Sequence, residues 1–284
     1  MHPEYVERYR RTPSPLVFMP RVVRPYAGLG PGGAFPSVVT TWSGARFDER
    51  QIGRFCSATG LEPSSILFPH AFAFRLVMAT LTHRAFPLPI WSALQVRNRL
   101  VAHRPLDLGG TYDFETRVVG HRTLDKGVEV DLATTARRDG EVDWESVVSV
   151  YYRGRFPGPT TVAPASPDLA GASEVAAFRM PGGGGWSFGG LTGDFNGVHL
   201  WRGYARRFGF PDAFLHPQNA VGRCLARLPA PASAAQRLDL WIKGPVFYEA
   251  DVALSAVRRG ETTDFGLRIV GDPRFALAGT WSAE

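Results

Sequence analysis

An approximate internal repeat is the feature of this sequence that most constrains its fold. In the first half, residues 47–60 predict a short helix that ends at Gly60. Residues 67–86 are apolar on nearly all sides and too long for one ordinary strand, so they predict a buried helix. Segments of alternating polar and apolar residues then predict strands within 92–105, 110–122, 126–140 and 141–155, separated by turn signals such as Asp139-Gly140.

The second half repeats this order. Thr192-Gly193 corresponds to Thr59-Gly60, residues 213–228 correspond to the buried helix, and Pro245 corresponds to Pro105. Strands are predicted within 236–259, 262–272 and 274–284. A helix followed by an antiparallel sheet, occurring twice, is typical of an α+β fold and not of alternating βαβ units. We therefore expect an N-terminal unit over 1–154 and a C-terminal unit over 186–284.

Residues 155–185 between the units are rich in Pro, Gly, Ala and Ser, which predicts a surface linker. The four glycines at 182–185 raise the alternative of a phosphate-binding loop. No Lys-Ser/Thr follows them, and Trp186-Ser187-Phe188 does not resemble the start of a helix. A flexible linker is therefore the expectation.

The bulk properties indicate a globular protein. The chain has 284 residues, 44% of them hydrophobic, and no apolar run approaches the ~20 residues of a membrane helix. The first 20 residues mix charges and prolines, unlike a secretory signal. Cys56 and Cys224 form neither a metal-ligand spacing nor a disulfide framework, which favours a cytoplasmic location. The net charge of +6 fits either a solvated arginine-rich surface or attraction of an anionic ligand, and no nucleic-acid motif accompanies it.

The two halves differ at one informative place. From Gly60 to His70 there are 10 positions, whereas from Gly193 to Pro217 there are 24, so the second half has about 14 extra residues. Within six positions this stretch holds Asp194, Asn196 and His199. A carboxylate and an imidazole this close can hold one water and exchange a proton near neutral pH. The alternative is that these residues only cap a helix and form a turn, as Asp and Asn after Gly commonly do.

The segment TGDFNGVHLWRGYARRFGFPDAF resembles the hydratase motif of the MaoC-like family, Ser/Thr-Gly-Asp-x-Asn-Pro-Ile-His followed by a short helix and Gly-Phe. The matching residues are Thr192, Gly193, Asp194, Asn196, His199, Ala205, Gly209 and Phe210. The resemblance implies a double hotdog fold, in which two helix-wrapped antiparallel sheets are expected to join edge to edge. Its degenerate N-terminal half shapes the acyl tunnel and its C-terminal half is catalytic. It also implies reversible hydration of trans-2-enoyl thioesters to (3R)-3-hydroxyacyl thioesters, with Asp194, His199 and Asn196 as the catalytic group.

The same resemblance implies a substrate carried on coenzyme A or an acyl carrier protein, with no metal, no organic cofactor and neither nucleic acid nor membrane as partner. The oligomeric state stays open, a homodimer included. The residues expected to bind the substrate are Gly193, Gly197, His216, Pro217, Gln218, Asn219 and Lys243. In the first half, Leu61 and Pro63 occupy the places of Asp194 and Asn196, so a second active site is not expected.

Two departures from the family motif bear on activity. Gly197-Val198 replaces Pro-Ile, which loosens the loop because glycine lacks the fixed φ of proline. Pro217 stands where the family has the glycine whose N–H is thought to bind the thioester oxygen, and proline has no N–H. The backbone N–H groups of Gln218 or Asn219 are the expected substitutes, with the helix beginning near Pro217.

Arg97, Arg99, His103 and Arg104 lie in one predicted strand region, with Lys243 near the equivalent place of the second half. Either they contact phosphates of the carrier, or they are basic side chains on a solvent-facing strand. Three functions remain open: a hydratase/dehydratase, a catalytically weak acyl-thioester binding or scaffold protein suggested by Pro217, and a hotdog thioesterase. The complete Asp194, Asn196 and His199 set favours the first.

Overall fold

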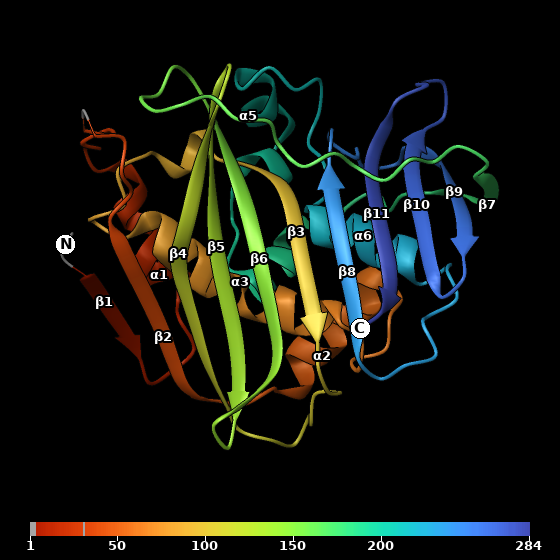
Figure 1. Cartoon of the computed structure of the whole chain (residues 1–284), viewed down its shortest axis with the longest axis horizontal. Coiled ribbons are helices and arrows are strands. Elements are labelled where there is room, and N and C mark those ends of the chain that lie inside the picture. The colour runs from red at the N-terminus through yellow and green to blue at the C-terminus, as the bar shows by residue number, and fades with distance from the viewer. Residues whose placement is uncertain (1–3, 31) are drawn as a thin grey trace.

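The computed structural model describes residues 4–30 and 32–284, and these residues form one sheet of 11 strands with helices packed on one face (Figure 1). The strand order is β1-β2-β4-β5-β6-β3-β8-β11-β10-β9-β7. Strands β1 and β2 pair in parallel, and all other neighbours are antiparallel. The strands of the first half are β1 (Glu4–Tyr9), β2 (Ser37–Ala45), β3 (Leu94–Ala102), β4 (Tyr112–Leu124), β5 (Gly127–Arg138) and β6 (Glu141–Arg153). Those of the second half are β7 (Ser173–Arg179), β8 (Gln236–Ile242), β9 (Asp251–Arg259), β10 (Thr262–Ile269) and β11 (Phe275–Ala283).

The helices divide between the halves in the same way. The first half has α1 (Pro15–Phe18), α2 (Glu49–Thr59), α3 (Leu67–Thr82) and the 3₁₀ turns η1 (Met19–Val23) and η2 (Ile90–Ser92). The second half has α4 (Gly185–Thr192), η3 (Gly197–His199), α5 (Arg202–Arg207) and α6 (Pro217–Leu225). Within the described residues, no helix has the length and apolar composition that crossing a bilayer requires.

The two halves join edge to edge through β3 and β8, as predicted. Antiparallel pairing runs from Arg97 opposite Trp241 to Ala102 opposite Gln236, which removes two exposed strand edges. One continuous hydrophobic core crosses the junction and includes Phe68 of α3 and Leu240 of β8. The halves are therefore packed units of one body.

The buried helix of the first half is confirmed. All 16 residues of α3 are buried, which agrees with its lack of a polar face. Helix α2 begins with a capping box between Asp48 and Gln51 and ends at Gly60 in the left-handed conformation, with φ 77°. The Asp139-Gly140 turn has positive φ at both residues (53° and 86°), as the turn between β5 and β6 requires.

Three features differ from the sequence prediction. The segment 155–185 is not only a linker, because it contributes β7, which pairs with β9 at the edge of the sheet. The prediction that no helix starts at Trp186 was wrong, since α4 begins at Gly185. The apolar surroundings at this place stabilise a short helix despite its glycines, and Phe188 and Leu191 are fully buried. Strands β1 and β2 were not predicted, although the β-branched run of SVVTTW at 37–42 is a strand signal.

Candidate active site

The loop that holds the candidate catalytic residues starts from the end of α4. Gly193 adopts the left-handed conformation with φ 77°, the same value as Gly60 at the end of α2. Thr192 Oγ1 donates to the Phe188 carbonyl (3.0 Å) and accepts from Asp194 N–H (3.2 Å). Thr59 makes the same two contacts in the first half, with the carbonyl of Phe55 and the N–H of Leu61. The predicted correspondence of the two Thr-Gly pairs is thus confirmed, and it places Asp194 where the first half has Leu61.

Asp194 and Asn196 each fold the loop back on itself. Asp194 Oδ1 accepts from Asn196 N–H (3.0 Å), and Asn196 Oδ1 accepts from Val198 N–H (3.3 Å) at the start of η3. These are the local turns that Asp and Asn side chains favour. The turn role proposed for Asn196 is therefore present, while the second carboxylate oxygen of Asp194 stays available for chemistry.

His199 is held from two sides. Its Nδ1 lies 2.9 Å from the Phe214 carbonyl, which assigns the proton to Nδ1 and leaves the lone pair on Nε2. Its backbone carbonyl accepts from the Tyr248 hydroxyl (2.9 Å). No local pattern pointed to Tyr248, because it lies 49 positions from His199 in the sequence. The result is an imidazole with one fixed orientation and one free basic nitrogen.

The free atoms of the two residues face each other. His199 Nε2 lies 3.7 Å from Asp194 Oδ2, with side-chain exposures of 6% and 15%. This distance is too long for a direct hydrogen bond and suits one shared water. Burial lowers the pKa of His199, although the Asp194 carboxylate and the Phe214 carbonyl oppose the shift. The imidazole is therefore neutral at pH 7 and can accept a proton.

His216 lies behind this pair and not on the cavity wall. Its ring stacks on the His199 ring with centroids 4.0 Å apart and an interplanar angle of 25°. Its Nε2 lies 2.9 Å from the backbone carbonyl of Asp194, to which it donates. Burial lowers the pKa of His216 to about 3, so the ring is neutral. His216 was predicted to contact the substrate; in the structure it instead contacts both Asp194 and His199.

Asp194, His199 and His216 offer nitrogen and oxygen atoms within 4.8 Å of one another, a spacing compatible with a metal ligand set. However, an imidazole binds a metal ion in the plane of its ring. The near-parallel stacking of the two rings does not direct both lone pairs at one ion, and His216 Nε2 already faces the Asp194 carbonyl. The geometry therefore fits a water between Asp194 and His199 better than a metal.

A cavity of about 660 Å³ opens beside the Asp194–His199 pair and extends into the first half. Its far wall is apolar and comes from α3, η1 and η2, with Met19, Val22, Phe74, Met78, Leu81 and Ile90. Near the pair it is lined by aromatic residues from the extra segment, among them Trp201, Tyr204 and Phe208. Their spacing of three and four positions on a short helix was a signal that the sequence prediction did not use. This size and lining suit an apolar chain.

Helix α6 begins at Pro217, as predicted, and Pro217 lines the same cavity as Asp194 and His199. The first two N–H groups after Gln218 are used locally, because Asn219 and Ala220 both donate to the His216 carbonyl (3.0 and 3.3 Å). Within the described part of the chain, Gln218 N–H makes no hydrogen bond. It is therefore a free donor at this helix end.

The other predicted substrate-binding residues have varied positions. Gly197 and Lys243 line the cavity, whereas Gly193, Gln218 and Asn219 do not. The Gln218 side chain donates to Gln95 Oε1 (3.3 Å), and Asn219 Oδ1 accepts from Arg223 Nε (3.1 Å). Both amides are thus used within the protein, so any contact of Gln218 with a substrate would come from its backbone.

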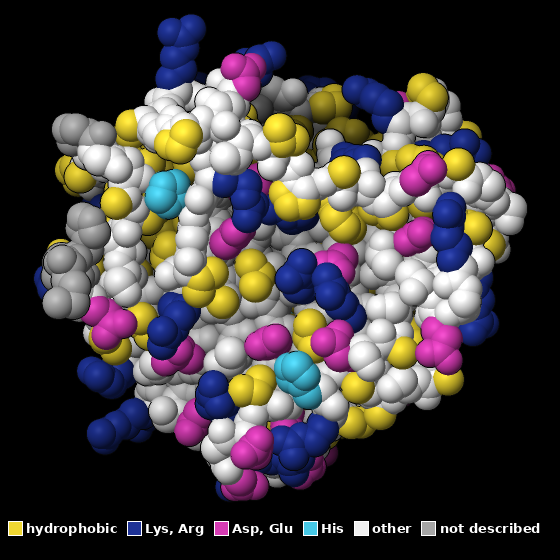
Figure 2. Space-filling model, viewed as in Figure 1, with side chains coloured by type: hydrophobic (Ala, Val, Ile, Leu, Met, Phe, Trp, Pro, Cys, Tyr) yellow, Lys and Arg dark blue, Asp and Glu magenta, His cyan; other side chains and the backbone are white. Residues whose placement is uncertain are grey.

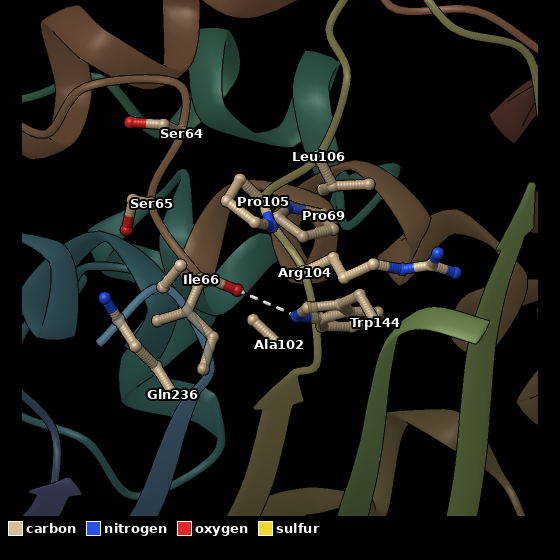
Figure 3. A pocket seen from close by; sticks show the side chains of 11 residues that line it. Ser64, Ser65, Ile66, Pro69, Ala102, Arg104, Pro105, Leu106, Trp144 and Gln236 are labelled. Atoms are coloured by element: carbon tan, nitrogen blue, oxygen red, sulfur yellow. Dashed lines mark hydrogen bonds between the residues drawn. The ribbon is translucent and has the colours of Figure 1, made fainter. Parts of the chain in front are cut away.

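A second, smaller cavity lies near the start of α3, where the two halves meet. It has a volume of about 190 Å³. Figure 3 shows its lining side chains, among them Ser64, Ser65, Arg104 and Gln236. The Trp144 indole lines this cavity and donates to the Ile66 carbonyl (2.9 Å).

His70 is buried and does not line this cavity; its Nε2 lies 3.4 Å from Asn98 Nδ2. No carboxylate is on the cavity lining. The described residues of the first half do include one His–carboxylate pair of the same length, His103 Nε2 to Glu145 Oε1 at 3.7 Å. Its side chains are 39% and 47% exposed and line neither cavity, unlike the Asp194–His199 pair.

The basic residues of the sheet are mostly paired. Arg97 donates to Glu129 (2.9 Å) and Arg99 to Asp239 (3.1 Å), and Figure 2 shows blue and magenta side chains interspersed over the open sheet face. This favours the interpretation as solvent-facing strand residues over contact with phosphates. Lys243 donates to Ser166 Oγ (2.6 Å) in the linker. Lys243 and Arg153 are the cations that line the large cavity.

Comparison with solved structures finds the predicted fold. HtdX of Mycobacterium tuberculosis superposes with a TM-score of 0.75 at 21% identity, over 87% of this chain and 100% of HtdX. A MaoC-like dehydratase from Phytophthora capsici gives 0.70 at 16% identity, over 90% of this chain and 98% of its own. A conserved hypothetical protein of M. tuberculosis with a double hotdog fold gives 0.58 at 14% identity, over 90% and 98%. The sequence matches no protein-family model and no curated protein. The chain thus has a double hotdog fold.

Proposed function

We propose that this double hotdog protein catalyses the reversible hydration of trans-2-enoyl thioesters, a hydro-lyase reaction. The observation that carries the proposal is the 3.7 Å gap between Asp194 Oδ2 and His199 Nε2, beside an apolar cavity of about 660 Å³. A fixed carboxylate and a neutral imidazole around one water are the groups that addition of water to a conjugated double bond needs. The fold shared with MaoC-like dehydratases agrees with this reaction class.

In the proposed reaction, the shared water attacks C3 of the enoyl chain while His199 Nε2 accepts a water proton. The C2–C3 π electrons move toward the carbonyl and form an enolate. A proton then returns to C2, so that one water adds across the double bond and gives the (3R)-3-hydroxyacyl thioester. Dehydration is the reverse. The reaction moves only water and protons, so the proposal includes no metal and no organic cofactor.

Negative charge builds on the thioester oxygen as the enolate forms, and hydrogen-bond donors there lower the barrier. Gln218 N–H at the start of α6 is the proposed donor, because it makes no hydrogen bond within the described residues and the helix N-terminus favours negative charge. Gln218 itself is not on the cavity lining, so the thioester oxygen would have to reach this N–H beside Pro217, which is on the lining. Pro217 lines the cavity but contributes no donor.

The acyl chain would lie along the wall formed by α3, η1 and η2, which gives the first half its role in substrate binding. The carrier would remain outside, near Arg153 and Lys243, the two cations on the cavity lining. Phosphates of coenzyme A and an acidic acyl carrier protein both suit such cations.

Incubation with crotonyl-CoA tests the proposal. We expect loss of the enoyl absorbance and formation of 3-hydroxybutyryl-CoA without free thiol. Release of free thiol would indicate a thioesterase instead. Binding without turnover would support the acyl-thioester binding protein, the alternative that the missing N–H of Pro217 favours.

The same assay tests the roles of the pair. Asp194→Asn and His199→Ala should each lower turnover by a factor of roughly a hundred or more, because each removes one partner of the water. His70→Gln, which changes a buried imidazole of the first half, is the control and should leave turnover close to that of the unmodified protein. An unchanged rate in either pair variant, at unchanged stability, would remove that residue from the mechanism.

A further inference from the structure

A buried arginine of the first half reaches the helix that precedes the catalytic loop. Arg75 lies on α3 with 7% of its surface exposed. Its Nε donates to the Leu191 carbonyl (2.9 Å), its Nη2 to the Gly190 carbonyl, and its Nη1 to the Pro13 carbonyl (3.3 Å). Leu191 and Gly190 belong to the last turn of α4, whose carbonyls have no partners within the helix.

This guanidinium has no carboxylate at ion-pair distance in the described part of the chain. Burial lowers the pKa of Arg75 to about 10, so the side chain stays charged at neutral pH. A buried charge is costly unless hydrogen bonds compensate it. Here the negative end of the α4 dipole and three carbonyl oxygens provide the compensation.

Arg75 also packs against the residue before Asp194. A Cβ built on Gly193 would lie 3.1 Å from Arg75 Cγ and 3.5 Å from its Cα, so this turn rests directly on the arginine. Gly193 has φ 77°, and the next residue is Asp194. We propose that Arg75 is a positioning residue for Asp194: it fixes the end of α4 and thereby the direction of the carboxylate toward His199. This inference rests on the proposed hydration reaction.

The chain contains its own comparison for this role. Arg75 follows Pro69 of α3 by six positions, and Arg223 follows Pro217 of α6 by six. Gly222, next to Arg223, lies against Thr59 at the end of α2, as Arg75 lies against Gly193. The Arg223 guanidinium nevertheless donates to Asn219 of its own helix, and in the described residues it holds no carbonyl of α2. Of these two arginines, only Arg75 donates to the carbonyls at a helix end, and that helix is followed by the candidate catalytic Asp194.

The experiment compares Arg75→Met, Arg75→Lys and Arg223→Met in the crotonyl-CoA assay. Displacement of a reacting group by about 1 Å can cost up to about a hundredfold in rate. We expect turnover of Arg75→Met to fall by roughly tenfold to a hundredfold, with partial recovery in Arg75→Lys, which keeps the charge and one donor nitrogen. Arg223→Met should retain the turnover of the unmodified protein.

A double-mutant cycle separates positioning from general loss of structure. If Arg75 acts through Asp194, then Arg75→Met should cause little further loss in an Asp194→Asn background. Rate losses that multiply in the double variant would show that Arg75 acts independently of Asp194, and would overturn the proposal.

Hydrogen–deuterium exchange gives a readout that does not depend on the reaction. Peptides covering residues 190–200 should lose protection in Arg75→Met and not in Arg223→Met. Unchanged protection in Arg75→Met would overturn the positioning role even in an active enzyme. Failure of the unmodified protein to hydrate the thioester, with the expected loss of protection, would reject the proposed function alone.

Discussion

At the scale of single residues, the two halves differ in the residue that follows a shared Thr-Gly pair. Thr59-Gly60 and Thr192-Gly193 make the same hydrogen bonds and share the same left-handed glycine. The residue that follows is Leu61 in the first half and Asp194 in the second. The same backbone geometry therefore places an apolar side chain, Leu61, in the first half and a carboxylate, Asp194, in the second.

Substitutions at Pro217 and Gln218 test which group binds the thioester oxygen. Pro217→Gly adds a backbone N–H at the start of α6, so turnover should rise or stay nearly unchanged; one donor in such a site is worth at most about 2.7–4 kcal/mol. Gln218→Ala should leave turnover near that of the unmodified protein, because the side chain already donates to Gln95. Steady-state hydration rates of both variants check this. A large loss in Gln218→Ala at unchanged stability would mean that its side-chain amide, and not its backbone, contacts the substrate.

At the scale of elements, the helix before the loop in each half packs on a helix of the other half, α2 on α6 and α4 on α3. Gly222 of α6 lies against Thr59 at the end of α2, and Gly193 at the end of α4 lies against Arg75 of α3. Glycine at these crossings lets the backbones approach closely. The helices thus connect the two halves on one face of the sheet, while the other face is open (Figure 1).

Two glycine substitutions with opposite expected effects test this packing. In Gly222→Ala, the new Cβ would lie 2.5 Å from Cβ and Cγ2 of Thr59, so we expect destabilisation by about 1–3 kcal/mol. In Gly53→Ala, the new Cβ in the middle of α2 meets nothing within 4 Å, and better helix propensity should stabilise the protein by roughly 0.5–1 kcal/mol. The free energy of unfolding in urea measures both. Equal effects of the two substitutions would contradict the close crossing.

At the scale of the whole molecule, the fold buries imidazoles as neutral groups. Burial lowers the pKa of His70 and of His216 to about 3, and it also lowers that of His199. The unfolded chain takes up protons on these groups below its pKa of about 6.5, whereas the folded chain does not. Stability from His70 and His216 is therefore fully present above about pH 6.5 and is lost as the pH falls toward about 3.

Each such imidazole should lower the free energy of unfolding by about 1.4 kcal/mol per pH unit within this window. His70→Gln should accordingly reduce the slope of stability against pH by about one proton between roughly pH 6 and pH 4. Urea unfolding at intervals from pH 7 to pH 4 measures the slopes. Identical slopes for the variant and the unmodified protein would show that His70 titrates in the folded state as it does in the unfolded chain.

Several features depend on neighbouring residues alone and could be predicted from the sequence. The repeat, the buried helix, the helix end at Gly60 and the Asp139-Gly140 turn follow from periodicity and turn chemistry, which act within a few positions. Asp194, Asn196 and His199 could be proposed together because they lie within six positions.

Other features depend on distant partners and exist only in the folded protein. The helix α4 and the strand β7 are stabilised by packing and pairing with remote segments, and not by their glycine-rich or linker-like sequences. Likewise His216, Tyr248 and Arg75 take their roles from contacts with residues 22, 49 and 115–116 positions away. Local propensity cannot specify such contacts, because they form only when the two halves share one sheet and one core.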